Sequence, residues 1–278
     1  MTHRSRRARR AMHPAPWFHA MALAAVPAFA NGQGTPIEPP GRVATPAPMP
    51  APAEPPASSP WRFTVMPYVW ATGMSGSLRP VTGAPTVEFD KGFFETLEDL
   101  DGAFFLSFGA EKGRFVLLGD VSYVATSREG LIAGAIPAEG SLEQLTLSLG
   151  AGYRVHADSD FVLDLFAGVR VFDLQADLQA FGGALTASPS RTIVDPIIGA
   201  RAILPFSERW AAVFYADVGG FGVGTESTVV ASALVSYSFS ATTALSLGYR
   251  AMWVDYDDEG TLADVTLGGP VIGLAFRF

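Results

Sequence analysis

The sequence predicts an all-β fold, a transmembrane antiparallel up-and-down β-barrel of about ten strands, on three observations. Hydrophobic residues make up 49% of the chain and charged residues only 17%, with a mean hydropathy of +0.25. No apolar run reaches the roughly 18 residues that a membrane-spanning helix requires. After residue 60, apolar residues recur at every second position, which is the period of a β-strand. Apolar residues spread in this way are typical of membrane barrels.

Residues 1–30 have the layout of a secretory signal peptide. Five arginines between positions 4 and 10 precede a short apolar stretch, 20–30, that ends in the pattern Ala28, Phe29, Ala30. A basic region, a short apolar region and an A-x-A ending are typical of a cleaved export signal. We therefore expect cleavage after about Ala30, with a soluble amphipathic helix as the alternative.

Residues 31–60 separate this signal from the first strand. The stretch contains ten prolines, and its only charged residues are Glu38, Arg42 and Glu54. Such a composition cannot build a core, and proline favours an extended backbone. We expect a disordered spacer, with a proline-rich docking ligand as the alternative, and assign residues 61–278 to the barrel.

Charge and cysteine content exclude several functions. Residues 1–30 hold five of the 19 basic residues and no acidic one, so the remainder carries 14 basic and 27 acidic residues. A chain this acidic is not expected to bind the phosphates of a nucleic acid. Cysteine is absent, which excludes disulfides and thiolate sites. We expect no cofactor.

The alternation after Trp61 divides into about ten strands, with eight or twelve as alternatives. In 141–155, for example, Leu145, Leu147 and Leu149 alternate with small or polar residues. Each strand is long enough for the roughly 9–11 residues that cross a bilayer when tilted. The predicted strands cover residues 61–72, 103–112, 114–126, 141–155, 160–180, 189–206, 210–223, 228–240, 243–257 and 263–278.

Tight and longer connections alternate strictly along the chain. Outer-membrane barrels show this pattern, with short periplasmic turns and longer external loops. A soluble up-and-down barrel would also have an even number of strands, but its apolar face would point inward. The tight turns are expected at 112–113, 157–159, 207–209 and 240–242, and the longer segments at 73–102, 127–140, 181–188, 224–227 and 258–262.

Charged residues at mid-strand positions decide which face points outward. Charges facing lipid are costly, so the apolar face is assigned outward and the charged face to a lumen. Inside a narrow barrel these five bases and five acids can pair into a network, whereas a lipocalin-like barrel has an apolar interior. The predicted lumen network consists of Arg62, Glu111, Asp120, Arg154, Asp164, Arg170, Asp195, Arg201, Asp217 and Arg250.

The first external segment and the end of the chain carry two further signals. In the first segment, 86–90 is strand-like and 92–100 has the spacing of a short helix, which could lie in the barrel mouth or on its rim. At the end of the chain, alternate apolar residues face lipid on the strand that closes the barrel against the first one. This ending resembles the signal read by the barrel-assembly machinery, and it comprises Ile272, Leu274, Phe276 and Phe278.

Six stretches of the chain together resemble a family of proteobacterial outer-membrane β-barrel proteins. They are WRFTVMPYVWATGMSGSL, GRFVLLGDVSYV, VDPIIGARA, DVGGFGVGTEST, GYRAMWVDYDDEG and GPVIGLAFRF. The family is largely uncharacterised and is loosely similar to small OmpA- and OmpW-like barrels. The resemblance spans nearly all of 61–278 and implies a fold and a location, the outer membrane of a Gram-negative bacterium, without any catalytic residues. The chain departs from the family at Ala251 and Met252 and in its long proline-rich prefix.

Histidine is nearly absent from the predicted barrel, which argues against an enzyme. His3, His13 and His19 lie in the predicted signal, and His156 lies at a periplasmic turn. General-base catalysis most often uses histidine, so no catalytic residue is assigned.

Acidic residues in DYDDEG are spaced like the start of a calcium-binding loop. Asp255, Asp257 and Glu259 fit that opening, but Thr266 stands where the loop requires glutamate. No metal site is assigned, and a weak cation site here remains the alternative to a solvated acidic loop.

These observations predict a non-enzymatic outer-membrane barrel, structural or weakly conducting, with a charged, hydrogen-bonded lumen. A small-solute, porin-like channel is the first alternative, and a lipid-modifying enzyme is the second. The expected partners are outer-membrane lipid, lipopolysaccharide and, during biogenesis, the assembly machinery. The barrel is expected to be a monomer.

Overall fold

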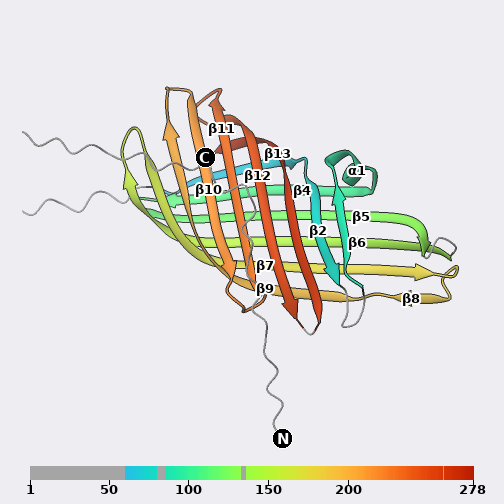
Figure 1. Cartoon of the computed structure of the whole chain (residues 1–278). Coiled ribbons are helices and arrows are strands. Elements are labelled where there is room, and N and C mark those ends of the chain that lie inside the picture. The colour runs from blue at the N-terminus through green and yellow to red at the C-terminus, as the bar shows by residue number, and fades with distance from the viewer. Residues whose placement is uncertain (1–59, 80–84, 133–135, 259) are drawn as a thin grey trace, which may run out of the picture. The chain divides into compact units, whose positions relative to one another are not determined.

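A computed structural model describes residues 60–79, 85–132, 136–258 and 260–278 (Figure 1). The predicted signal peptide, 1–30, and residues 31–59 of the predicted spacer lie outside the described residues. In the described part of the chain, no helix is long and apolar enough to span a membrane.

Strands make up most of the described chain. They are β1 (Arg62–Trp70), β2 (Gly73–Arg79), β3 (Val87–Lys91), β4 (Leu100–Lys112), β5 (Phe115–Ile132), β6 (Ile136–Ala157), β7 (Val162–Ala180), β8 (Leu185–Ala187), β9 (Ser190–Pro205), β10 (Trp210–Gly220), β11 (Ser227–Ser238), β12 (Thr243–Asp258) and β13 (Thr261–Arg277). One short helix, α1 (Phe93–Glu98), lies in the predicted first external segment.

The sheet closes on itself into the predicted antiparallel barrel of ten strands. Each strand pairs with the next, in the order β1, β4, β5, β6, β7, β9, β10, β11, β12, β13, and β13 returns to β1. β2 continues β1 in the same register against β13, and β8 likewise continues β9 against β7. Closure pairs the backbone groups of the first and last strands, so the wall has no free edge there.

Four tight turns join strands at the end of the barrel where β1 begins, here called the terminal end; the opposite end is the loop end. Side-chain oxygens hold three of these turns by accepting a hydrogen bond from a backbone N–H. Asp158 accepts from Phe161 at 2.7 Å, Ser207 accepts from Trp210 at 3.2 Å, and Ser240 accepts from Thr243 at 3.1 Å. In the β4–β5 turn, Gly113 has φ +59°, a conformation that favours glycine. Local turn chemistry therefore fixes this end of the barrel.

The hairpin of β5 and β6 is longer than predicted. Most of the expected connection 127–140 is strand, because pairing continues from Ser127–Ser141 to Ile132–Ile136. The stretch contains three glycines and a proline, which are typical of loops, but backbone pairing does not require an apolar face. Figure 1 shows β5, β6 and β7 running side by side toward the loop end.

The first external segment lies on the rim of the barrel. β1 pairs with β4 only up to Tyr68–Phe105, and beyond it β2 pairs with β3 instead. α1 contacts β2 and β3, and none of its side chains is buried. The helix therefore lies on the rim of the barrel, which is one of the two positions that the sequence left open.

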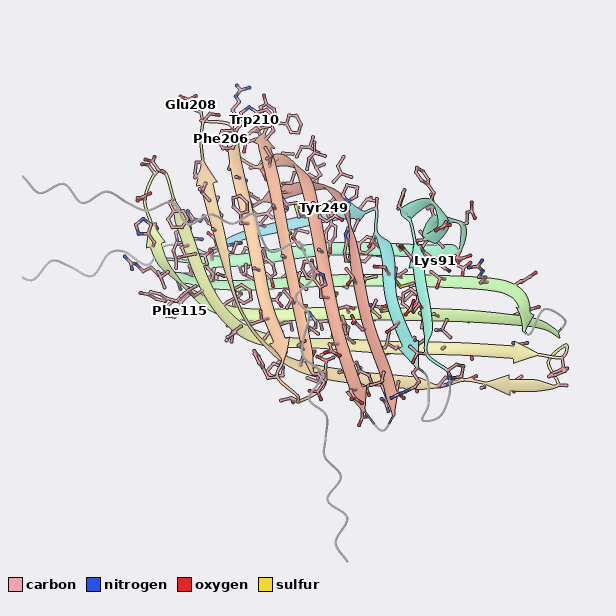
Figure 2. All side chains as sticks on the ribbon, in the orientation of Figure 1. Lys91, Phe115, Phe206, Glu208, Trp210 and Tyr249 are labelled. Atoms are coloured by element: carbon pink, nitrogen blue, oxygen red, sulfur yellow. The ribbon has the colours of Figure 1, made fainter. Side chains whose placement is uncertain are left out.

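Side chains alternate between a buried inner face and an exposed apolar outer face. On β12, Met252 is 4% exposed, whereas its outward neighbours Trp253 and Tyr249 are 43% and 54% exposed. Aromatic rings gather on the outer face at the terminal end, where Figure 2 labels Phe115, Phe206 and Trp210. Pairs of these rings are in contact: Phe115–Tyr153, Phe206–Trp210, Trp210–Tyr237 and Tyr237–Phe239, with centroids 4.8–6.5 Å apart.

Candidate functional site: the charged lumen

The structure places all ten predicted lumen charges on the inner face, and nine of them form ion pairs with one another. They fall into three groups at different levels of the barrel. Alternation along each strand determines which residues point inward. Which of these charges pair with one another depends on the register between neighbouring strands.

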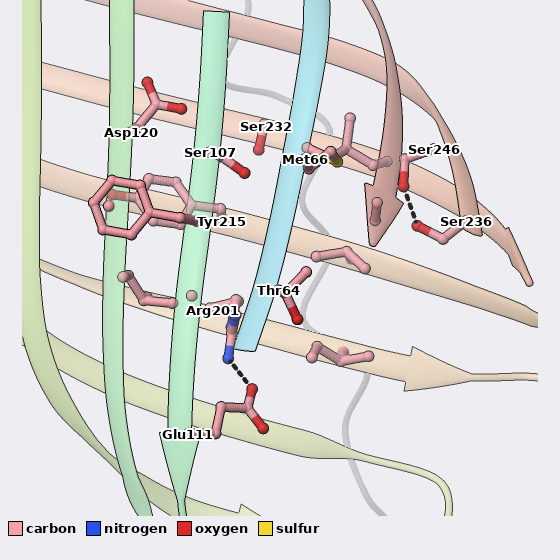
Figure 3. Close-up of a pocket in the computed structure, with 18 of the residues that line it drawn as sticks. Thr64, Met66, Ser107, Glu111, Asp120, Arg201, Tyr215, Ser232, Ser236 and Ser246 are labelled. Carbon is pink, nitrogen blue, oxygen red and sulfur yellow. Dashed lines mark hydrogen bonds and ion pairs between the residues drawn. The ribbon is translucent and has the colours of Figure 1, made fainter. Parts of the chain in front are cut away.

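The first group, the terminal-end cluster, joins residues of β1, β4, β6, β7 and β9. Asp164 has a fully buried side chain and binds Arg154 at 2.8 Å and Arg201 at 2.6 Å. Glu111 binds the same two guanidinium groups, each at 2.9 Å, and Arg62 at 3.2 Å. Figure 3 shows its interaction with Arg201. Three guanidinium groups therefore share two carboxylates, which leaves one formal positive charge.

The second group is a buried pair between β7 and β10. Arg170 donates to Asp217 at 2.7 Å, and both side chains are almost completely buried. Tyr215 donates its hydroxyl hydrogen to the same carboxylate at 2.7 Å. Arg170 also donates to Ser148 at 3.0 Å and to Thr228 at 3.3 Å. The pair is thus compensated by hydrogen bonds, as a buried pair requires.

The third group lies between β1, β5 and β12. Arg250 binds Asp120 at 2.9 Å and donates to the hydroxyl of Tyr68 at 2.6 Å. Tyr68 in turn donates to Asp120 at 3.0 Å. The Arg250 guanidinium also lies 5.1 Å from the ring centroid of Trp70, within cation–π range.

The tenth residue, Asp195, has no basic partner among the described residues. Its carboxylate accepts the backbone N–H and the side-chain hydroxyl of Thr225, both at 2.8 Å. Both residues are almost fully buried. Asp195 therefore anchors the β10–β11 connection inside the lumen.

An apolar cluster also fills part of the lumen, although the sequence pattern indicated a polar interior. The cluster contains Tyr68 and six other buried apolar or aromatic residues: Trp70, Phe105, Phe172, Val230, Met252 and Val271. They come from β1, β4, β7, β11, β12 and β13, and hence from opposite walls of the ring. The signal was present in the sequence, because Trp70, Phe172 and Met252 each follow an inward-facing residue by two positions.

The other candidate residues lie away from the lumen. Ile272, Leu274, Phe276 and Phe278 are 36–76% exposed on the outer face, and β13 pairs with β1 as the closing strand. His156 lies near the end of β6, beside the β6–β7 turn, and its Nε2 is 2.7 Å from Asp158. Asp255 and Asp257 are exposed on β12, and Glu259 lies outside the described residues. Among the residues that the structure covers, no group of three His, Cys, Asp or Glu side chains is placed to hold a metal ion.

Comparison with known proteins identifies the fold. No family model matches the chain, and no curated protein matches it. Among solved structures, the outer-membrane protease OmpT of Escherichia coli aligns with 81% of this chain and 99% of its own, at 11% identity and a TM-score of 0.51. The translocator domain of the autotransporter NalP of Neisseria meningitidis aligns with 78% of this chain and 88% of its own, at 16% identity and a TM-score of 0.43. At these identities the likeness is one of architecture: the chain has the closed antiparallel barrel fold seen in outer-membrane proteins.

Proposed function

We propose that this protein is a non-enzymatic barrel of the Gram-negative outer membrane whose lumen is closed by its own side chains. The observation that carries the proposal is the buried cluster across the lumen. Phe172 on β7 packs in one cluster with Trp70 on β1 and Met252 on β12, which are strands of opposite walls. Bulky side chains that meet from opposite walls leave no continuous path for a solute.

The outer face supports the membrane location. Large apolar residues there are exposed on nearly every strand of the barrel wall, and aromatic rings are concentrated at the terminal end. Such a surface is typical of contact with lipid, with aromatic side chains at the level of the headgroups. By the usual arrangement of these barrels, the terminal end faces the periplasm and the loop end contacts lipopolysaccharide.

Three partner proposals follow from the same surface. The exposed apolar alternation from Ile272 to Phe278 is the segment that we propose the assembly machinery recognises. Because the ring of ten strands is closed, no edge strand of the wall is free to pair with another copy, and we propose a monomer. We also propose that nucleic acid is not a partner, because the acidic balance of the chain disfavours contacts with phosphates.

A small-solute channel is the second candidate, because a cavity of about 680 Å³ occupies the lumen nearer the terminal end. The cavity ends against the buried cluster, which favours the closed barrel over the channel. Measurement of conductance separates the two.

Location is tested by fractionating cells that express the full chain and comparing boiled with unboiled samples on a gel. The proposal predicts a heat-modifiable band in the outer-membrane fraction. A protein that is soluble in buffer and shows no gel shift would contradict it. Leu247→Arg places a charge on the exposed outer face and should block insertion, since arginine near the bilayer midplane costs about 2–4 kcal/mol. Glu208→Arg, in the β9–β10 turn labelled in Figure 2, is the matched control and should insert normally.

A further inference from the structure

The lumen contains a cavity that closes at one end. Its volume of about 680 Å³ lies within the roughly 300–1,000 Å³ of typical small-molecule sites. The cavity reaches the terminal end of the barrel, where exposed Arg62 and Thr242 line it. Toward the loop end, its lining includes Tyr68, Val230 and Val271, which belong to the buried cluster that contains Trp70. A ligand would therefore enter and leave at the terminal end.

The mouth of the cavity carries excess positive charge. The terminal-end cluster has three guanidinium groups and two carboxylates, as described above. Arg277 of β13 adds a fourth guanidinium to the lining, and it has no ion-pair partner among the described residues. The Arg62 side chain is 67% exposed, although it pairs with Glu111. Guanidinium groups with unused donors are suited to a carboxylate or a phosphate.

Apolar side chains line much of the middle of the cavity, beside the hydroxyl groups of Ser107, Ser232 and Tyr215. Phe166, Ile197, Val213 and Leu234 contribute to its lining from β7, β9, β10 and β11, and Met66 contributes from β1 on the other side. Figure 3 shows Met66 and Tyr215 on different strands of this lining. Apolar side chains facing an open cavity gain stability when an apolar ligand removes them from water.

Charges at the inner end of the cavity already have partners. Arg250 pairs with Asp120 and Tyr68, and Arg170 pairs with Asp217. Arg250 and Arg170 therefore do not need an anionic group of a ligand as a counterion. The unmatched positive charge is confined to the mouth, so a ligand that fits both regions has its anionic group at the mouth and its apolar part inside.

We propose that this cavity is a binding site for a single-chain anionic amphiphile, an acyl chain that ends in a carboxylate or a phosphate. The acyl chain lies between Phe166, Ile197, Val213 and Leu234. The anionic group binds at Arg62 and Arg277. The inference goes beyond the proposed function, because it requires the folded barrel and does not depend on whether the lumen conducts.

The binding site is tested with a diazirine-labelled fatty acid. The barrel is refolded into phosphatidylcholine vesicles, irradiated with the probe, and digested for mass spectrometry. The proposal predicts cross-links to inward-facing residues such as Leu234, and predicts that unlabelled palmitate removes them. Cross-links confined to outward-facing residues such as Val235 would overturn it, because that pattern reports only lipid contact. Competition by lysophosphatidylglycerol, but not palmitate, would identify the phosphate form of the ligand and would still support the site.

Two variants locate the ligand within the cavity. Leu234→Trp fills the apolar middle and should abolish the lumen cross-links, whereas Val235→Trp, its outward-facing neighbour on the same strand, should leave them unchanged. Arg277→Gln should raise the palmitate concentration needed for half-maximal competition by about fivefold to tenfold, because a charge-assisted hydrogen bond is lost. A heat-modifiable gel shift confirms that each variant is folded. Lumen cross-links that persist at full strength in folded Leu234→Trp would contradict the assignment, as would an unchanged competition curve for Arg277→Gln.

Discussion

Arg170 on β7 lies directly opposite Asp195 on β9 in the strand register, yet its guanidinium binds Asp217 on the next strand, β10, at 2.7 Å. Asp195 instead accepts the backbone N–H and the hydroxyl of Thr225, both at 2.8 Å. The Arg170 side chain therefore reaches past its register partner and links two strands that are not adjacent. Such links allow mid-strand charges of opposite sign to pair inside the lumen.

Breaking this link should destabilise the barrel strongly. Asp217→Asn removes the charge that compensates a buried guanidinium, and we expect the free energy of unfolding to fall by about 3–5 kcal/mol. Urea unfolding of the barrel refolded in detergent micelles measures the change. Replacing both partners, with Arg170→Met and Asp217→Leu, should recover most of the loss, because no unpaired charge remains.

The matched control for that experiment is an exposed ion pair. Arg128 binds Asp99 at 3.5 Å, and its side chain is 66% exposed. Arg128→Gln should change the free energy of unfolding by less than about 1 kcal/mol, because water screens the pair. An equal effect of Asp217→Asn and Arg128→Gln would contradict the buried-link account.

The end of β13 should matter more for assembly than for stability. Phe278 exposes 76% of its surface, but its backbone pairs with Phe63 in both directions, at 2.9 and 3.1 Å. Phe278→Ala keeps this pairing and removes only an exposed ring. We expect the free energy of unfolding in vitro to change by less than about 0.5 kcal/mol, whereas the amount of inserted barrel in cells should fall. Normal insertion in cells would contradict the proposed assembly signal.

The attachment of α1 should depend on pH only in acid. Lys91 donates to Asp99 at 2.7 Å, and this hydrogen bond holds the pKa of the Asp99 carboxyl below its ordinary value of 3.8. Arg128 also faces the carboxyl. Because the pKa is lowered in the folded state, the attachment is fully present above pH 3.8 and is lost as the pH falls through the lower folded value.

Hydrogen exchange of the α1 amides, corrected for the intrinsic dependence on pH, measures this attachment. Protection should be constant from neutral pH to about pH 5 and should decrease only below pH 3.8. In Asp99→Asn the protection should be lower and independent of pH. Loss of protection near neutral pH in the unmodified protein would contradict the role of Asp99.

The ten strands could be predicted because the two faces of each strand have different surroundings. Leucine and valine on the outer face and charged residues on the inner face impose a period of two that is visible in one sequence. In the first external segment, the strand near 86–90 and the helix followed from local spacing, whereas β2 was not predicted. The length of the β5–β6 hairpin was not predicted, because glycine and proline between residues 127 and 140 are typical of a loop, whereas the pairing depends on the backbone.

The inward position of the ten charges followed from the same alternation, but their partners did not. Which arginine meets which carboxylate depends on the register between strands and on long side chains, as Arg170 and Asp217 show. The role of Thr225 depends on a connection that folds into the lumen. The apolar cluster was not predicted, because the inner face was assigned from its charged residues, although the positions of Phe172 and Met252 relative to Arg170 and Arg250 place them inward.

The central claim, that side chains close the lumen, is tested most directly by planar-bilayer recording of the refolded barrel. We predict that the unmodified protein shows no stepwise conductance, and that removing the cluster in Trp70→Ala/Phe172→Ala/Met252→Ala produces discrete channels, with the gel shift confirming that this variant is folded. Stepwise conductance of the unmodified protein would contradict the closed lumen and favour the solute channel.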